Sequence, residues 1–468
     1  MQSGPASSFL ALLLLLGVIA FVLSRLPKVD LGHSAAFKRR RLMNWLPLGL
    51  TYAFLYFGRY NLSGVQPELE RLGLLSKQQF GDIDGLGAVV YGLAFLLNGP
   101  LTDRWGGRTT ILLAAGGSAA ANVATGVLFS LAMRNSVSGD ALRHGLFFTT
   151  AVNMYFQSFG AVSIVKVNAP WFHTRERGVL GGVFGILISL GLYFAYDWIP
   201  ALYRALGSLP LLFFVPAGVL ALFFVVDWLL IRNSPGEAGV ADFDTGDASY
   251  EGERETPGLW ALAKRMFSQR VIWTIVVIEF CSGFLRQAVM KWGRSYAKDV
   301  GAVSEFVFSN WGLVTCVAGI LGGVFAGFIS DAMFGSRRGP VVTVLYAGLL
   351  AGAGVALAVL GSPALGWSVV FMSLCVIGVH GMLSGTASAD FGGKRGAGMA
   401  TGIIDGFVYL GSATQAFVYG RVLPHGAAAH DAHNWRSWPI AMVPPALLGL
   451  GLALTLWNAR PATRPQGH

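Results

Sequence analysis

Apolar stretches follow one another along almost the whole chain, separated by short polar segments. Each stretch is about 20 residues long, which is enough to cross the hydrocarbon core of a bilayer as a helix. Backbone groups in a bilayer must be satisfied within their own segment, so helices are the expected structure. The pattern predicts twelve main spans at 44–64, 83–101, 109–132, 145–170, 178–203, 209–231, 271–297, 306–330, 340–361, 366–388, 397–420 and 437–458.

An additional apolar run, 9–23, precedes these spans. It has no basic residue before it, whereas Arg25, Lys28 and the basic stretch 38–41 follow it. This arrangement favours an uncleaved helix with its N-terminus outside over a secretory signal.

One long polar segment interrupts the pattern, and its part 236–255 is rich in Asp, Glu and Gly. Such a composition is typical of a flexible linker. We therefore predict five regions: an extra N-terminal helix with a basic cytoplasmic segment (1–43), an N-terminal six-helix half (44–231), a cytoplasmic linker (232–270), a C-terminal six-helix half (271–458) and a cytoplasmic tail (459–468).

Composition agrees with a membrane protein, because only 12% of the residues are charged and 54% are apolar. The net charge of +10 comes from basic residues between the apolar spans, so no nucleic-acid partner is expected. The cysteines Cys281, Cys316 and Cys375 fit no metal site and are expected to be buried thiols. No nucleophile–base pair, metal-ligand cluster or cofactor motif is visible, so an enzyme is not expected.

The distribution of Lys and Arg predicts the orientation in the membrane. Of the 34 basic residues, 21 lie before the first span, after the even-numbered spans or at the C-terminus, and eight lie in the opposite loops. Because basic loops remain in the cytoplasm, we expect a multi-pass protein of the cell membrane with a cytoplasmic C-terminus.

The two halves resemble each other at a nearly constant offset. Trp45 and Trp273 are 228 residues apart, and Arg59 and Arg286 are 227 apart. The segment 99–104, Gly-Pro-Leu-Thr-Asp-Arg, has a counterpart in 327–331, Gly-Phe-Ile-Ser-Asp. The repeat predicts an all-α membrane protein with two parallel six-helix repeats, the arrangement of the major facilitator fold.

The loop 99–108 reads Gly-Pro-Leu-Thr-Asp-Arg-Trp-Gly-Gly-Arg and resembles the signature of the major facilitator superfamily between spans 2 and 3. Asp103 at a helix end can pair with arginines and with a neighbouring helix N-terminus. We interpret Asp103, Arg104 and Arg108, with Asp331 in the second copy, as a cytoplasmic latch between the halves. The alternative is a solvated turn.

Arg59 and Arg286 each lie roughly 20 Å along their helices, near the middle of the membrane. An unpaired arginine there is costly and is expected to face a wet cavity or a partner. Two guanidiniums on opposite walls suit a phosphate or a carboxylate. In the alternative interpretation, each arginine is neutralised by a protein acid such as Glu279 or Asp405.

The segment 56–61, Tyr-Phe-Gly-Arg-Tyr-Asn, resembles span 1 of the organophosphate:phosphate antiporter family, which includes glycerol-3-phosphate and hexose-phosphate transporters. Further similarity lies at 171–178, 232–239, 284–296 and 394–411. The resemblance implies that Arg59 and Arg286 bind the substrate phosphate, that access alternates, and that inorganic phosphate is exchanged. The chain departs from the family pattern at Phe95, near Ile188 and at Lys291.

Other polar residues within the spans are candidates for the same cavity. Tyr56 and Tyr60 are the best placed, since they are within one turn of Arg59. Lys291 could instead point outward to the interface, and His380 could carry a proton or serve only as a packed hydrogen-bonding group. The further candidates for polar contacts in the cavity are Tyr91, Tyr155, Gln157, Lys291, His380, Asp405 and Tyr409.

Together these patterns predict a secondary active transporter of a small phosphorylated organic anion, such as a sugar phosphate or glycerol phosphate, in exchange for inorganic phosphate. It is expected to function as a monomer in the lipid bilayer, without a cofactor. Two alternatives remain open, namely a proton-coupled transporter of another organic anion and a membrane sensor that binds a sugar phosphate without transporting it.

Overall fold

The computed structural model describes residues 13, 15–21, 24, 32–173, 186–187, 189–243, 268, 270–334, 338–383 and 388–458, and all regular structure among them is helical. The expectation of an all-α fold is therefore confirmed. The longer helices are α2 (Ala35–Arg59), α5 (Lys77–Trp105), α6 (Gly107–Met133), α7 (Gly139–Asn168), α10 (Leu211–Leu230), α12 (Arg270–Asp299), α14 (Trp311–Phe334), α15 (Arg338–Ala358), α16 (Ala364–His380), α17 (Ser388–Val422) and α19 (Val443–Thr455). Shorter helices are α3 (Asn61–Gly64), α4 (Gln66–Arg71), η3 (Phe194–Trp198), α9 (Ile199–Leu206), α13 (Phe306–Ser309) and α18 (Ser437–Ile440).

Serine side chains define where several helices begin. Ser34 accepts a hydrogen bond from the backbone N–H of Phe37 at the start of α2. At the start of α5, Ser76 and Gln79 form a reciprocal capping box. These contacts satisfy backbone donors that have no partner within the helix.

Seven of the described helices are long and apolar enough to cross a membrane. They are Lys77–Thr102, Gly107–Met133, Leu211–Leu230, Arg270–Asp299, Arg338–Ala358, Ala364–Leu383 and Ala432–Thr455. The predicted spans 44–64, 145–170, 306–330 and 397–420 coincide with α2, α7, α14 and α17, which contain more polar residues or shorter apolar stretches. The span predicted at 178–203 begins outside the described residues and continues through η3 and α9.

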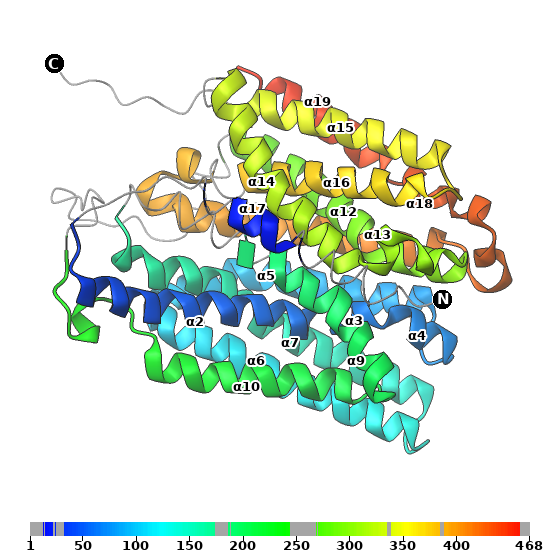
Figure 1. The fold of residues 1–468 in the computed structure, drawn as a ribbon, viewed down its shortest axis with the longest axis horizontal. Helices are drawn as coiled ribbons and strands as arrows, with labels where there is room; N and C mark the ends of the chain where they lie inside the picture. The colour runs from blue at the N-terminus through cyan, green and yellow to red at the C-terminus, as the bar shows by residue number, and fades with distance from the viewer. Residues whose placement is uncertain are drawn as a thin grey trace.

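The helices lie roughly side by side, with the blue-to-green helices α2–α10 in the lower part of Figure 1 and the yellow-green to red helices α14–α19 in the upper part. The two halves meet chiefly where α5 packs along α17 and where η3 packs on α14. Glycines allow the close approach of α5 and α17, because a Cβ on Gly92 would lie 2.8 Å from the carbonyl oxygen of Gly406. This close packing places residues of both halves beside each other in the interior of the bundle.

Part of the apolar run 9–23 also lies within the described residues. Residues 15–21 are helical, and Leu15 is buried against Leu313, Cys316 and Ile320. The rest of this run lies outside the described residues, so its assignment as a thirteenth helix stays a prediction.

Candidate functional site

Arg59 lies at the end of α2, and only 4% of its surface is exposed. Its Nε donates a hydrogen bond of 3.1 Å to Oε1 of Gln157 on α7. The rings of Tyr56 and Tyr91 both have their centres 4.5 Å from the guanidinium carbon. Within the described part of the chain, Nη2 of Arg59 has no hydrogen-bond partner and the residue makes no ion pair. A charge buried in this way is stabilised by ring faces and one amide rather than by a carboxylate.

Arg286, on α12 of the other half, is also buried, and Tyr409 of α17 lies between the two arginines. The hydroxyl of Tyr409 is 3.3 Å from Nη1 of Arg59, and the ring centre of Tyr409 is 5.6 Å from the guanidinium carbon of Arg286. Among the described residues, Arg286 makes no hydrogen bond or ion pair. The two arginines predicted from the repeat therefore approach one shared tyrosine from opposite halves.

Tyr60 connects this pair to a third cation. Its hydroxyl accepts a hydrogen bond of 3.3 Å from Nε2 of Gln287, and its ring centre lies 5.4 Å from Nζ of Lys291 and 5.9 Å from the guanidinium carbon of Arg59. Tyr56 and Tyr60 thus both contact Arg59, as their spacing predicts. The phenol at position 60 lies where cations from both halves converge.

Lys291 is buried, and its Nζ lies 2.5 Å from both carboxylate oxygens of Asp84 on α5. The alternative that Lys291 points outward to the membrane interface is therefore wrong, because an acid of the other half neutralises it in the interior. Asp84 is not among the site residues predicted from the sequence. An acidic residue within an apolar span was the available signal, since such residues are rare and are usually paired or functional.

A small polar cavity of about 20 Å³ lies beside Arg59 within the N-terminal half. That volume has room for a water molecule. Arg59 and Asp84 both line the cavity, so it connects Arg59 with the Asp84–Lys291 pair. Thr149 also lines it, and its hydroxyl has no hydrogen-bond partner among the described residues.

The remaining cavity candidates separate into two groups. Gln157 and Tyr91 contact Arg59 directly, as described above. Tyr155 instead packs its ring against Phe156 and Phe159, and Asp405 is partly buried in α17, four residues before Tyr409.

His380 lies beside Glu279, and its Nδ1 is 3.3 Å from Oε2 of Glu279. The acid suggested as a neutralising partner of Arg286 is therefore hydrogen-bonded to a histidine.

Among the predicted latch residues, Asp103 and Arg104 belong to the last turn of α5, Arg108 to the first turn of α6, and Asp331 to α14. The side chains of Asp103 and Asp331 lie outside the described part of the structure. Arg104 is exposed. Arg108 donates from Nη2 to the carbonyl oxygen of Trp228 at 2.7 Å, which ties the start of α6 to α10. The latch therefore stays a prediction.

The opposite end of the bundle carries a set of ion pairs between the two halves. We call this end, with Glu68, Lys77, Asp82, Asp299 and Arg421, the Lys77 face. Nζ of Lys77 lies 2.7 Å from Asp299, an oxygen of Asp82 lies 2.8 Å from Arg421, and an oxygen of Glu68 lies 2.5 Å from Lys298. All three pairs join the N-terminal to the C-terminal half, so they hold this end of the bundle closed.

A further contact between the halves is made by η3. The two carboxylate oxygens of Asp197 accept hydrogen bonds of 2.9 and 2.8 Å from the backbone N–H groups of Gly312 and Leu313. These N–H groups belong to the first turn of α14, where the helix dipole favours a negative charge. Arg294 of α12 lies 3.9 Å from the same carboxylate.

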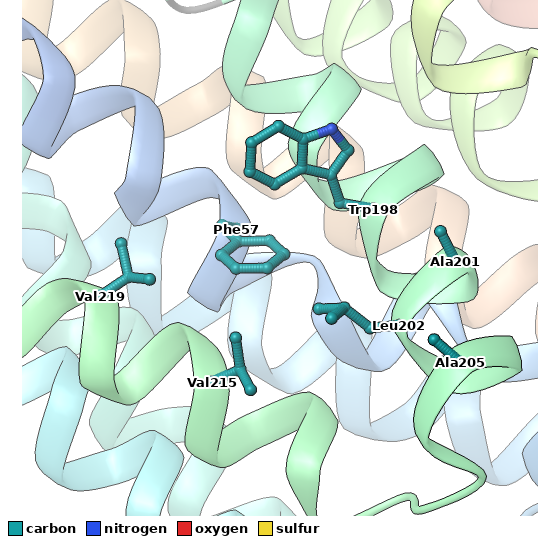
Figure 2. Close-up of a pocket in the computed structure, with 7 residues that line it drawn as sticks. All are labelled: Phe57, Trp198, Ala201, Leu202, Ala205, Val215 and Val219. Carbon is teal, nitrogen blue, oxygen red and sulfur yellow. The ribbon is translucent and has the colours of Figure 1, made fainter. Parts of the chain in front are cut away.

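A separate apolar pocket of about 410 Å³ lies between α2, α9 and α10 (Figure 2). Phe57, Trp198 and Leu202 are among its lining residues, and no charged side chain lines it. It offers nothing to bind an anion, and it contains none of the predicted site residues.

Comparison with known proteins identifies the family. Residues 48–416 match the Major Facilitator Superfamily. The chain belongs to this superfamily. The superfamily consists of membrane transporters and not of enzymes, so this chain is a multi-pass membrane protein of the transporter class.

Curated relatives narrow the resemblance. The chain is 27% identical to the glycerol-3-phosphate transporter of Bacillus subtilis (strain 168), over 92% of this chain and 95% of the relative. It is 26% identical to the membrane sensor protein UhpC of Salmonella typhimurium, over 82% and 85%. It is 25% identical to a probable hexose phosphate transport protein of Chlamydia muridarum, over 87% and 89%. These relatives confirm the resemblance to the organophosphate:phosphate antiporter family.

Solved structures confirm the fold. A bacterial homologue of the human lysosomal transporter Spinster superposes with a TM-score of 0.67 at 15% identity, covering 91% of this chain and 97% of that one. A D-xylose–proton symporter superposes with a TM-score of 0.64 at 16% identity, covering 90% and 98%. The architecture is therefore the major facilitator fold with two six-helix halves.

Proposed function

We propose that the protein is a secondary active transporter of a small phosphorylated organic anion, such as a glycerol phosphate or a sugar phosphate, in exchange for inorganic phosphate. One observation carries the proposal. Two buried arginines, Arg59 and Arg286, approach one tyrosine from opposite halves, and neither makes an ion pair with a described acid. A bound phosphate offsets the cost of burying these two charges. We call Arg59 and Arg286 the phosphate clamp.

The family resemblance supports the choice of phosphate. Curated relatives are a glycerol-3-phosphate transporter and a probable hexose phosphate transport protein. Two guanidiniums that present planar forks suit the three oxygens of a phosphate ester better than a single ammonium would. Tyr56, Tyr60 and Tyr91 supply ring faces and hydroxyls beside them, which suit a sugar or glycerol moiety.

In the proposed mechanism, access alternates because contacts between the halves close one end of the bundle at a time. The distribution of basic residues favours a cytoplasmic C-terminus, which places the Lys77 face outside the cell. The ion pairs of this face close the outer side, and the latch of Asp103 and Asp331 closes the inner side when the halves rock. A cysteine at Ser249, in the linker, should then resist impermeant reagents in intact cells, and ready labelling from outside would reverse the orientation.

The latch has its own test. Asp103→Asn is expected to slow turnover and to leave substrate affinity within about threefold, because it changes a state equilibrium rather than the binding site. Turnover equal to that of the wild type would count against the latch.

Transport is tested by uptake of labelled phosphate into proteoliposomes that are preloaded with glycerol phosphate, hexose phosphate or buffer alone. Exchange predicts uptake only into vesicles preloaded with a phosphate ester or phosphate. Uptake into buffer-loaded vesicles that depends on an imposed pH gradient would favour the proton-coupled alternative.

A membrane sensor is the second candidate, because the relative UhpC carries that name and aligns over most of the chain. A sensor requires the same clamp, since it must bind the phosphate ester. It differs from a transporter in showing saturable binding of the ester without exchange in the proteoliposome assay.

A further inference from the structure

Glu279 and His380 form a buried acid–histidine pair that the anion clamp does not use. Glu279 on α12 is completely buried, and its Oε2 lies 3.3 Å from Nδ1 of His380 on α16. Its other oxygen, Oε1, has no hydrogen-bond partner among the described residues. His380 keeps 27% of its side chain exposed, whereas Glu279 is fully enclosed, so His380 is the more accessible member of the pair.

The pair is electrostatically linked to the clamp. Glu279 lies two helical turns before Arg286 on the same helix, about 10 Å along its axis. In the buried interior, the positive charge of Arg286 stabilises the negative charge of Glu279 and is stabilised by it in return.

Ionisable groups on the neighbouring helices belong to the surroundings of this pair. The helices that pack on α12 include α14, α16, α17 and α19, and Tyr346 of α15 donates a hydrogen bond to the carbonyl oxygen of Ile278. No acidic or basic residue occurs in the sequence of α19. Apart from Glu279 itself, the ionisable residues in the sequences of α14, α15 and α16, and in the parts 275–290 of α12 and 401–413 of α17, are Cys316, Asp331, Arg338, Tyr346, Cys375, His380, Cys281, Arg286, Asp405 and Tyr409. Arg338 is the cation of α15, and its Nη1 lies against Met382, two residues after His380.

We propose that Glu279 and His380 bind one proton whose occupancy is linked to the anion on Arg286, so that anion binding is accompanied by proton uptake. The inference rests on the proposed phosphate clamp. When phosphate neutralises Arg286, Glu279 loses the charge that stabilised its carboxylate. A proton from water then adds to the pair, either on His380 or on Glu279, and changes its net charge from −1 to 0. By reciprocity, a bound proton strengthens anion binding.

The linkage is tested on the purified full-length protein by calorimetric titration with inorganic phosphate. Titrations in two buffers with different enthalpies of ionisation give the number of protons taken up for each phosphate bound. Phosphate has its own ionisation, but that is the same for every variant, so differences between proteins isolate the pair. Wild type is expected to take up a fraction of a proton that Glu279→Gln does not. The phosphate affinity of the wild type should fall more steeply with rising pH than that of Glu279→Gln, by up to about tenfold per pH unit.

Two further variants keep the test decisive. Asp227→Asn is the matched control, because Asp227 is a buried acid on α10 with one oxygen bonded to Thr51 and the other without a described partner. It should keep the proton uptake of the wild type, and loss of that uptake would overturn the assignment to Glu279. If Glu279→Gln does not fold, His380→Gln keeps the carboxylate and should move the pH of half-maximal uptake by at least about one unit.

The outcomes separate the two proposals. Equal proton counts in wild type and Glu279→Gln, with phosphate binding intact, would overturn the linkage and leave the clamp standing. Likewise, an unchanged uptake profile in His380→Gln would overturn it. Absence of phosphate binding by the wild type would overturn the clamp itself.

Discussion

The hydroxyl of Tyr409 lies 3.3 Å from Nη1 of Arg59, so a residue of the C-terminal half occupies a hydrogen-bond donor of the buried arginine in the N-terminal half. The same ring lies beside Arg286. A phosphate that binds both arginines must compete with this hydroxyl for Nη1 of Arg59. We therefore propose that Tyr409 is both a spacer between the two guanidiniums and a contact that the substrate replaces.

Tyr409→Phe is expected to tighten phosphate binding by up to about tenfold, because the hydrogen bond that phosphate must replace is gone while the ring remains. Binding of labelled phosphate to purified protein measures the effect. Tyr155→Phe is the matched control, since Tyr155 packs against phenylalanine rings and should leave the affinity unchanged. Weaker binding by Tyr409→Phe would instead show that the hydroxyl itself holds the anion.

The Asp84–Lys291 pair is expected to behave as a buried ion pair. Asp84→Asn leaves the lysine charge buried without a partner and should lower the free energy of unfolding by about 3–5 kcal/mol. Adding Lys291→Met removes that charge and should recover most of the loss, so the two effects are not additive. Thermal unfolding of the single and double variants in detergent measures this. Equal instability of Asp84→Asn and the double variant would contradict the pairing.

The Lys77 face is expected to control access from its own side. Lys77→Met removes the buried ammonium that bonds Asp299 and the carbonyl oxygen of Pro424. A cysteine at Ser63, which is buried in the closed form, should then react with a maleimide at least about fivefold faster. The native cysteines are all buried and contribute little background.

Arg71→Gln is the control for this experiment. Arg71 bonds Glu68 within the same half, and its side chain is 57% exposed, so its ion pair contributes little. It should leave the labelling rate unchanged. Equal acceleration in both variants would show that the pairs between the halves do not hold this face closed.

The Glu68–Lys298 pair is expected to keep the Lys77 face closed from neutral pH into the mildly acidic range. Burial raises the pKa of Glu68, but hydrogen bonds from Lys298 and Arg71 outweigh it and leave the pKa below the ordinary value of 4.5. A carboxyl with a lowered pKa stabilises the closed face fully above its ordinary pKa and loses that contribution only as the pH falls through the lowered value. The labelling rate of a cysteine at Ser63 falls with pH because only the thiolate reacts, so it is divided by the rate of an exposed reference cysteine at position 72. This ratio should stay constant from neutral pH down to about 5.

The periodic features of the sequence predicted much of this structure, and the contacts between distant helices were harder to predict. The repeat of Arg59 and Arg286 predicted two arginines at similar depth, and spacing along one helix predicted that Tyr56 and Tyr60 would contact Arg59. Whether a side chain on α5 meets one on α12 depends on how the two halves pack, which no local pattern encodes. For that reason the partner of Lys291 was missed.

Arg59 and Arg286 are proposed to bind one phosphate together. Replacing either arginine by lysine keeps the charge but loses the planar fork. A charge-assisted contact is worth about 1.5–3 kcal/mol, so each variant should bind phosphate roughly 10- to 150-fold more weakly. The rival view, in which protein acids neutralise the arginines separately, predicts that removing Glu279 or Asp405 rescues Arg286→Gln. It also predicts that phosphate does not protect the site from arginine-modifying reagents.

The most direct measurement is the phosphate affinity of Arg59→Lys, Arg286→Lys and the double variant, taken as a double-mutant cycle by calorimetric titration. If both arginines hold the same group, the double variant should bind little more weakly than the weaker single variant, because the first substitution already disrupts the joint grip. Two losses that simply add, or phosphate affinity that either substitution leaves unchanged, would contradict a shared phosphate clamp.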